Sequence, residues 1–215
     1  MQPSHTRRYS RREVEVEAAK ILHKFYGAKI KIPIAIDLIT EKHELVDDLI
    51  PAELLEGRFK VAAALVSKRN GHCDILVDED TITFQEARAN FSIAHELGHV
   101  VLHPKLYEDC DTIEKSILLK KRIKNVYRRI EREAHNFAEA LLMPRETIFN
   151  HTLKIYEALV RKYGYDSNLI IDKTSLALAC LYHVTKQPMD IRLERLGLIK
   201  KIKEALGYES PYLDP

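Results

Sequence analysis

The sequence predicts an α+β fold, with a small β-sheet in the first half of the chain and helices over most of the rest. Two apolar runs, residues 59–66 and 73–78, are separated by a turn that contains Asn70-Gly71. Asn-Gly between two apolar runs is the strongest short-range signal for a β-hairpin. Apolar residues recur at helical spacing over much of the remaining chain, which predicts a helical majority.

Composition limits the class of protein. A length of 215 residues, with 46% hydrophobic and 31% charged residues, is typical of one good-sized globular domain, with room for a small appendage. Net charge is only +2, so overall charge gives no argument for nucleic-acid binding. Cys73, Cys110 and Cys180 form no Cys-x-x-Cys pair, which favours free thiols in a reducing compartment. Without a signal peptide or an apolar run of spanning length, we expect a cytoplasmic protein and no membrane partner.

The predicted elements begin with a helix from Ser10, a suitable N-cap, to about Phe25, with Gly27 as its stop. A short helix is predicted over residues 34–41, because Pro33 suits a helix start. The two hairpin strands follow.

The hairpin leads into a helix predicted over about residues 84–103 and ended by Pro104. A polar loop and a long helix from about Glu114 to Leu142 come next. The later helices are predicted over residues 145–163, 173–183 and 188–196, the last one stopped by Gly197.

These elements are grouped into three predicted parts. Residues 1–32 form an N-terminal helix and basic tail, residues 33–165 form the core, and residues 166–215 form a small helical C-terminal unit. The loop over residues 164–172 marks the second boundary.

A short motif points to chemistry: His95-Glu96-Leu97-Gly98-His99. Residues four apart lie on the same face of a helix, so His95 and His99 can bind one metal ion together. Glu96 can reach a water at the open position of that metal. Chance alone would give this pattern in roughly a few per cent of such chains. Apolar residues on both sides make the helix a core element, so the motif predicts a zinc-dependent hydrolase if a third ligand exists.

Three residues are candidates for the third ligand of a catalytic zinc ion. His103 lies one turn beyond His99, about 11–12 Å along a straight helix from His95. One ion cannot be reached comfortably from both ends of that span, so His103 is predicted to be a helix-end or supporting residue. Glu131 lies beside the apolar stripe of the next long helix, and Glu133 lies about 200° away around it. Periodicity favours Glu131 only slightly, and both stay open.

Two longer motifs resemble those of the ImmA/IrrE metallopeptidase family. They are Phe91-Ser92-Ile93-Ala94-His95-Glu96-Leu97-Gly98-His99-Val100-Val101-Leu102-His103 and Glu131-x-x-Ala134-x-x-Phe137-Ala138-x-x-Leu141-Leu142-Met143-Pro144. Residues 181–185 and 192–199 are similar to the tail of that family. The resemblance spans about residues 33–199, and the two motifs occur in the expected order with the expected internal spacing.

The resemblance implies a zinc-bound, thermolysin-like (gluzincin-type) core, in which Glu131 completes the ligand set of His95 and His99. With that set, Glu96 is expected to take a proton from the attacking water and deliver it to the leaving amine. One departure is His135, which stands where the family usually has Asn or Asp. A His there can still orient a ligand by hydrogen bonding.

Two parts of the predicted site stay less defined. A donor for the developing oxyanion is expected, and the sequence does not select among Tyr182, His183 and Tyr156. The strand at residues 73–78 precedes the motif helix and is expected to offer an edge to an extended peptide.

Basic residues gather between residues 115 and 132, where they raise the question of nucleic-acid binding. We interpret them as the solvated face of a helix. Residues 173–196 have the length of a helix–turn–helix, but the turn lacks Gly and the second helix carries Asp190 and Glu194. Direct nucleic-acid contact is therefore not favoured. The basic group comprises Lys115, Lys120, Lys121, Arg122, Lys124, Arg128, Arg129 and Arg132.

The leading prediction is a zinc metalloendopeptidase of the ImmA/IrrE type. The resemblance implies a regulatory role in which such a protein cleaves a repressor-like DNA-binding protein, often in a mobile element or a stress response. The alternative is a non-proteolytic regulator or toxin–antitoxin binding module that retains the metal-site fold.

Overall fold

The structure is a computed structural model that describes residues 6–53 and 55–206. By its internal contacts the chain divides into two compact units, Met1–Leu142 and Met143–Pro215. The start of the predicted basic tail (1–5) and the end of the predicted C-terminal unit (207–215) lie outside the described residues.

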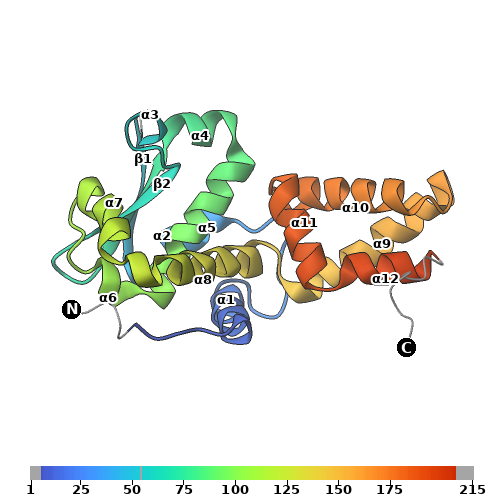
Figure 1. The fold of residues 1–215 in the computed structure, drawn as a ribbon, viewed down its shortest axis with the longest axis horizontal. Coiled ribbons are helices and arrows are strands. Elements are labelled where there is room, and N and C mark those ends of the chain that lie inside the picture. Colours follow the sequence, from blue (N-terminus) through green and yellow to red (C-terminus); the bar gives the residue numbers. More distant parts are fainter. Residues whose placement is uncertain (1–5, 54, 207–215) are drawn as a thin grey trace. The chain divides into compact units, whose positions relative to one another are not determined.

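The first helix, α1 (Arg11–Tyr26), has the predicted bounds and caps. The Ser10 hydroxyl accepts a hydrogen bond from Glu13 N–H and the Glu13 carboxylate accepts one from Ser10 N–H, which together form a capping box. Gly27 ends the helix with a φ of 67°, a conformation that favours glycine. The buried face of α1 packs on α8 (Lys124–Leu142), as Figure 1 shows.

The sheet has three strands in the order β1-β3-β2. The predicted hairpin is confirmed, because β2 (Ala63–Ser67) pairs antiparallel with β3 (Cys73–Asp78). Strand β1 (Val46–Ala52) pairs parallel with β3, and its sequence lacks the apolar alternation that would have predicted it. Pro51 is tolerated in β1 because this strand lies at an edge of the sheet.

The position of β3 corrects one prediction. Residues 73–78 were expected to offer an edge to a peptide, but β3 is paired on both sides and is the central strand. The outer strands of the sheet are β1 and β2, and the Ser67 N–H at the edge of β2 already donates to Cys110 O. The strand predicted from residue 59 begins only at Ala63, because Phe59 ends a short helix and Lys60 has a φ of 61°.

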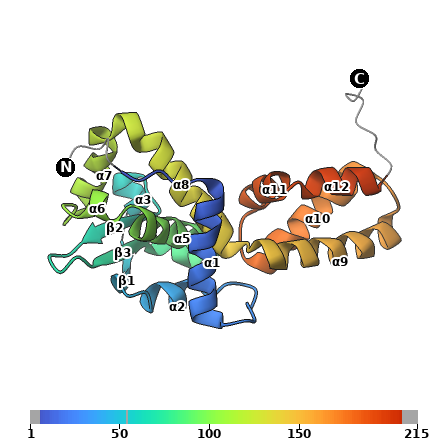
Figure 2. The ribbon, with the colours of Figure 1, turned by 90° about the horizontal axis from the view of Figure 1, so that it is seen from below.

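Two long helices form the centre of the first unit. They are α5 (Glu86–Leu102), predicted over 84–103, and α8, and each makes its most extensive packing against the other. The long helix predicted from Glu114 is in fact two helices, because α7 (Ile113–Arg122) ends at Ile123 before α8 begins. Helix α5 also packs on β2 and β3, so it lies between the sheet and α8 (Figure 2).

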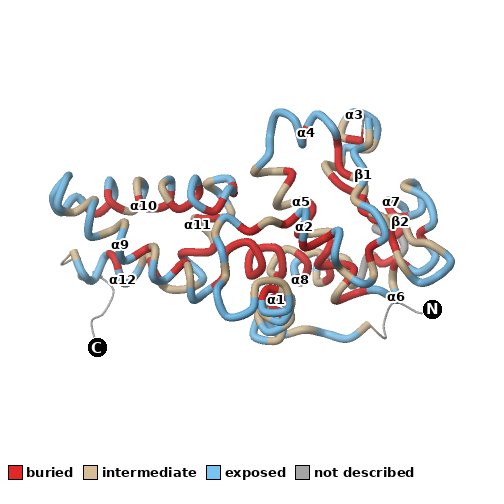
Figure 3. Tube along the Cα trace, turned by 180° about the vertical axis from the view of Figure 1, so that it is seen from behind, coloured by how far each residue is buried: buried red, intermediate tan, exposed pale blue. Residues whose placement is uncertain are grey.

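Short helices complete this unit. They are α2 (Ile36–Glu41), α3 (Leu55–Phe59), α4 (Glu79–Phe84) and α6 (Pro104–Tyr107). Pro104, the predicted stop of the motif helix, is the first residue of α6, and His103 is the C-cap of α5. Many of the buried residues of this unit lie on α5, α8 and the strands, and Figure 3 colours buried residues red along the chain.

The second unit contains four helices in the described residues: α9 (Arg145–Tyr163), α10 (Ser167–Tyr182), α11 (Lys186–Arg195) and α12 (Leu198–Ala205). Helix α10 packs against the other three. The buried Arg192 side chain donates a hydrogen bond from Nε to Met143 O at 3.1 Å. Asp190, one of the two acids on the second helix of the possible helix–turn–helix, accepts hydrogen bonds from Ser175 and Lys186.

The division of the chain differs from the predicted parts. The boundary falls between Leu142 and Met143, one helix earlier than the predicted boundary after residue 165, because α9 packs on α10 and α12. The predicted N-terminal part is not separate, since α1 packs on α8 within the first unit. All three cysteines are free thiols, and no helix of the described residues is long and apolar enough to cross a membrane.

Candidate metal centre

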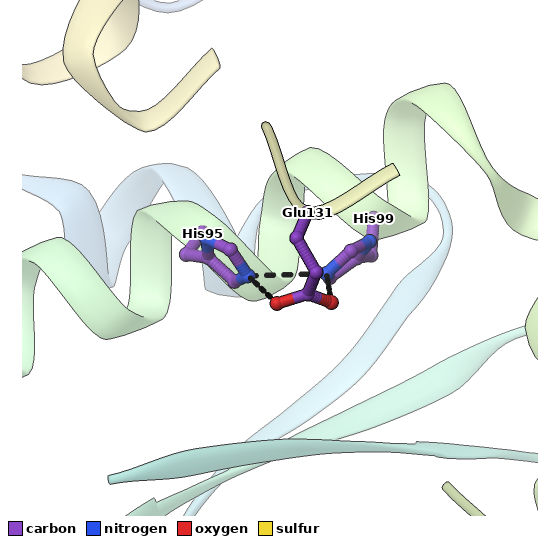
Figure 4. A group of neighbouring side chains, drawn as sticks. All are labelled: His95, His99 and Glu131. Carbon is purple, nitrogen blue, oxygen red and sulfur yellow. Dashed lines mark hydrogen bonds and ion pairs between the residues drawn. The ribbon is translucent and has the colours of Figure 1, made fainter. Parts of the chain in front are cut away.

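Three side chains from two helices converge in the first unit. The ring nitrogens of His95 and His99, both on α5, lie 3.1 Å apart (Nε2 to Nε2). The Glu131 carboxylate on α8 lies 3.5 Å from His95 Nε2 and 3.4 Å from His99 Nε2. Figure 4 shows the two rings and the carboxylate pointing toward one another. Among the described residues these three are the group of His, Cys, Asp and Glu side chains placed to hold a metal ion.

The close packing of α5 and α8 explains how the carboxylate reaches the histidines. A Cβ added at Gly98, between the two histidines, would lie 3.1 Å from Ala134 O and 3.1 Å from Phe137 Cδ1. The backbones of the two helices therefore approach so closely that a larger residue than glycine would force a shift of the neighbouring atoms. Glu131 lies three residues before Ala134, on the same face of α8, so this contact brings its carboxylate opposite the histidine pair.

The spacing of these atoms fits a zinc ion. Zinc binds His nitrogen and carboxylate oxygen at about 2.0–2.2 Å, so two ligand atoms at tetrahedral angles lie about 3.3–3.6 Å apart. The observed separations of 3.1, 3.4 and 3.5 Å are close to this range. Two imidazoles and one carboxylate also match the donor set of a catalytic zinc site with an open position.

The charge state of Glu131 suits a ligand. Burial alone would raise the pKa of its carboxyl group, but hydrogen bonds and charge from His95 and His99 bring the pKa far below its usual range. The carboxylate is therefore anionic at neutral pH.

Glu96 lies next to His95 on α5, and a small cavity adjoins both residues. The cavity has a volume of about 20 Å³, which is room for one water molecule. Its lining contains Ala63 and Ala64 of the edge strand β2, together with Ser116 and Ile117 of α7 and the site residues His95, Glu96, His99, Tyr107 and Glu131. The predicted base and the predicted ligands therefore share one cavity.

Two tyrosines that sequence reasoning missed adjoin the site. The ring of the buried Tyr107 lies 5.0 Å from that of His99, and the charges of Glu96 and Glu131 add to burial in raising its pKa. Tyr127 makes a side-chain hydrogen bond with Glu131, and burial and the Glu131 charge raise its pKa. Tyr127 lies four residues before Glu131 on the same helix, and this spacing could have indicated that the two side chains meet. Tyr107 follows a helix break, so no spacing in the sequence indicates its place beside the site.

The structure separates the other ligand candidates from this cluster. Glu133 points to His103, with 3.5 Å between Oε2 and Nε2, and it also pairs with Arg129. Of the two open candidates, Glu131 is therefore the one that lies with His95 and His99, and its role as a ligand stays a prediction. His135 pairs with the buried Glu139 at 3.2 Å, and no contact with the cluster is described for it.

The predicted oxyanion donors belong to the second unit. There the Tyr182 hydroxyl is buried and lies 2.9 Å from His151 Nδ1, at hydrogen-bond distance. His183 is exposed at the C-cap of α10, and Tyr156 is half-buried on α9. Their role stays a prediction.

The basic group between residues 115 and 132 is only partly described. Arg129 is largely buried and hydrogen-bonded, so it is not part of a solvated face. Lys115 pairs with Asp111 at 2.6 Å. The side chains of Lys120, Lys121, Arg122 and Lys124 lie outside the described residues. Nucleic-acid binding by this group stays a question for experiment.

Comparison with protein families agrees with the resemblance seen in the motifs. The model of a peptidase family described as the IrrE N-terminal-like domain matches residues 82–194, which is more than half of the chain. The chain belongs to this family. The matched residues contain both helices of the metal cluster. Neither the curated proteins nor the solved structures give a match.

Proposed function

We propose that this chain is a zinc-dependent endopeptidase with a thermolysin-like catalytic core. The observation that carries the proposal is the placement of His95, His99 and Glu131 around one point, with Glu96 beside them. Membership of a peptidase family supports the same reaction class. Zinc held by these three side chains would acidify a water molecule and polarise the scissile carbonyl.

Glu96 acts as the general base and acid in this proposal. Its carboxylate accepts a proton from the attacking water and then donates it to the leaving amine. Glu131 stays anionic and lowers the net charge of the ligand set. Tyr127 holds Glu131 in place through its hydroxyl group.

The edge strand β2 offers the peptide a backbone to pair with. In the β2–β3 ladder, Asp78 N donates to Ala62 O and Lys68 N donates to His72 O. By alternation, the N–H and C=O groups of Ala63 and Leu65 point away from β3, toward the edge. Because Ala63 also lines the cavity, a peptide added to this edge would pass beside the histidines.

The substrate proposed is a repressor-like DNA-binding protein. The family resemblance supports this part of the proposal. A mobile element or a stress response is the expected setting.

A second candidate function, a non-proteolytic binding module that retains the site, has one observation in its favour. The cavity at the cluster has a volume of about 20 Å³, room for one water molecule, and α7 contributes Ser116 and Ile117 to its lining. A binding module needs no more room at the cluster than this.

One experiment separates the two functions. Wild-type protein and the Glu96→Ala and Glu131→Ala variants are purified, and their zinc content is measured by mass spectrometry. Proteins retained by the Glu96→Ala variant are then incubated with the wild type. The proposal expects one bound zinc ion per chain in the wild type and in Glu96→Ala, and a loss of zinc in Glu131→Ala. Only the wild type should cleave a retained protein. If Glu96→Ala keeps full biological activity, the endopeptidase function is wrong.

A further inference from the structure

A second polar cluster lies on the same pair of helices as the metal site. It consists of His103 at the end of α5, and Arg129 and Glu133 on α8. His103 and Glu133 are only 3% and 4% exposed. Glu133 Oε2 lies 3.5 Å from His103 Nε2, and Arg129 Nη1 donates to Glu133 Oε1 at 3.2 Å.

The segment before α1 completes this cluster. Arg129 Nη1 donates to Arg7 O at 2.9 Å and Nη2 donates to Thr6 Oγ1 at 2.5 Å. Tyr9 N donates to Glu133 Oε1 at 3.4 Å, and the Tyr9 ring lies edge-on to the His103 ring at 6.1 Å. These contacts join positions more than 120 residues apart in the sequence.

We propose that Arg129 and Glu133 are positioning residues for Glu131, and that residues 6–9 belong to the same positioning cluster. The inference rests on the proposed role of Glu131 as the third metal ligand. Glu131 and Glu133 leave α8 about 200° apart, so they meet α5 on two sides of the helix contact. A rotation of α8 that moved Glu131 away from the histidines would also pull Glu133 from His103.

Stability alone is a weak reason for this cluster. Taking a carboxylate and a guanidinium out of water costs about as much as their pairing returns, and apolar residues of similar volume often serve stability as well or better. The hydrogen bonds of Glu133 with Arg129 and Tyr9 N, and those of Arg129 with residues 6 and 7, have a different benefit here: they tie α8 to the N-terminal segment while Glu133 lies against the His103 ring of α5. Metal ligands must be held within about 0.2 Å of their required distances, and Gly98 leaves no side chain that could set the rotation of α8 at the closest contact.

The test measures zinc affinity in the full-length chain, by competition with a chromophoric chelator. Arg129→Gln and Glu133→Gln are each expected to raise the zinc Kd about tenfold, as loss of a group that orients a ligand does. Arg128→Gln is the matched control, because Arg128 is the exposed neighbour of Arg129. Tyr9→Ala, a milder change in the N-terminal segment, should raise the Kd by a smaller factor. The absorption bands of bound Co²⁺ should shift in the first two variants and not in the control.

A double variant and a core variant test whether the effect is specific. Residues in one network are not additive, so Arg129→Gln with Glu133→Gln should raise the Kd about as much as either change alone. Ile75→Val, in the fully buried part of β3, should lower the melting temperature without changing the Kd. A melting temperature lowered by the Arg129 and Glu133 changes with an unchanged zinc Kd and Co²⁺ spectrum would overturn the proposal. A complete loss of metal in Glu133→Gln, with metal retained in Glu131→Ala, would also overturn it.

These outcomes differ from a failure of the proposed function. Metal affinity needs no substrate, so normal zinc binding without any cleavage would reject the endopeptidase while leaving the positioning role standing. A wild-type chain that binds no zinc would reject both, and the wild-type measurement alone would show it.

Discussion

Gly98 is the position where one added methyl group should affect both the fold and the metal site. In Gly98→Ala, the new Cβ would lie 3.1 Å from Ala134 O and Phe137 Cδ1, and 3.2 Å from Ala134 Cα. Carbon contacts are optimal at about 3.5–4.0 Å, so α5 and α8 must separate by about 0.4 Å. Two of these three atoms belong to the backbone and cannot rotate away.

The expected change in stability of Gly98→Ala is the sum of two opposing effects. Alanine is about 1 kcal/mol better than glycine inside a helix, whereas overpacking a tight contact costs about 1–3 kcal/mol. The metal-free variant should therefore be less stable by about 0–2 kcal/mol. A shift of about 0.4 Å exceeds the tolerance of about 0.2 Å for metal ligands, so we expect the zinc Kd to rise at least tenfold.

Two measurements on Gly98→Ala check this reasoning. Denaturant unfolding in the presence of EDTA gives the packing effect without metal, and chelator competition gives the zinc Kd. A variant that gains about 1 kcal/mol of stability from its better helix residue, and binds zinc as the wild type does, would refute the close contact between the helices.

Three further predictions concern single residues. Tyr127→Phe removes the hydroxyl that holds Glu131, so zinc affinity should fall about tenfold in a chelator competition, whereas Tyr156→Phe in the second unit should leave it unchanged. Ala63→Pro removes only an edge-facing N–H of β2, so peptide KM should rise while zinc content stays normal; an unchanged KM would argue against pairing at this edge. Burial lowers the pKa of His103 from 6.5 to about 3. Between pH 3 and pH 6.5, His103 therefore takes up a proton when the protein unfolds. Stability of the metal-free protein should be fully present above pH 6.5 and fall toward pH 3, by at most about 1.4 kcal/mol per pH unit from this group. Urea unfolding at several pH values should show a shallower slope in His103→Asn, and an equal slope would contradict the assignment.

The sequence predictions are most accurate where the signal lies in residues that are close together in the chain. The N-cap at Ser10, the stop at Gly27 and the hairpin turn at Asn70-Gly71 depend on residues within a few positions of one another, and all three are confirmed. Strand β1 was missed because it depends on its distant partner β3, and its own pattern shows no alternation. The break at Ile123 was missed because the helical pattern runs on through it. The start of α10 at Ser167 was missed although its signal is local, since the Asp166 carboxylate caps the helix by accepting from Asn168 N and Leu169 N.

For the candidate site, the sequence by itself placed two of the three proposed ligands together. Helical spacing puts His95 and His99 on one face and Glu96 beside them, because this relation needs nothing beyond a single helix. Periodicity could not decide between Glu131 and Glu133, since both lie near the buried stripe of α8. The resemblance to the ImmA/IrrE family implied Glu131, and in the structure Glu131 is the acid that lies beside the two histidines.

Only the tertiary structure decided what each acid on α8 faces. The contact at Gly98 sets α8 against α5, so that Glu131 meets the histidine pair and Glu133 meets His103, Arg129 and the N-terminal segment. That arrangement depends on the distance and rotation between two helices whose contact joins Gly98 to Ala134. The sequence pattern indicates which face of each helix is buried. Which residues on those faces meet is decided by how the two helices pack.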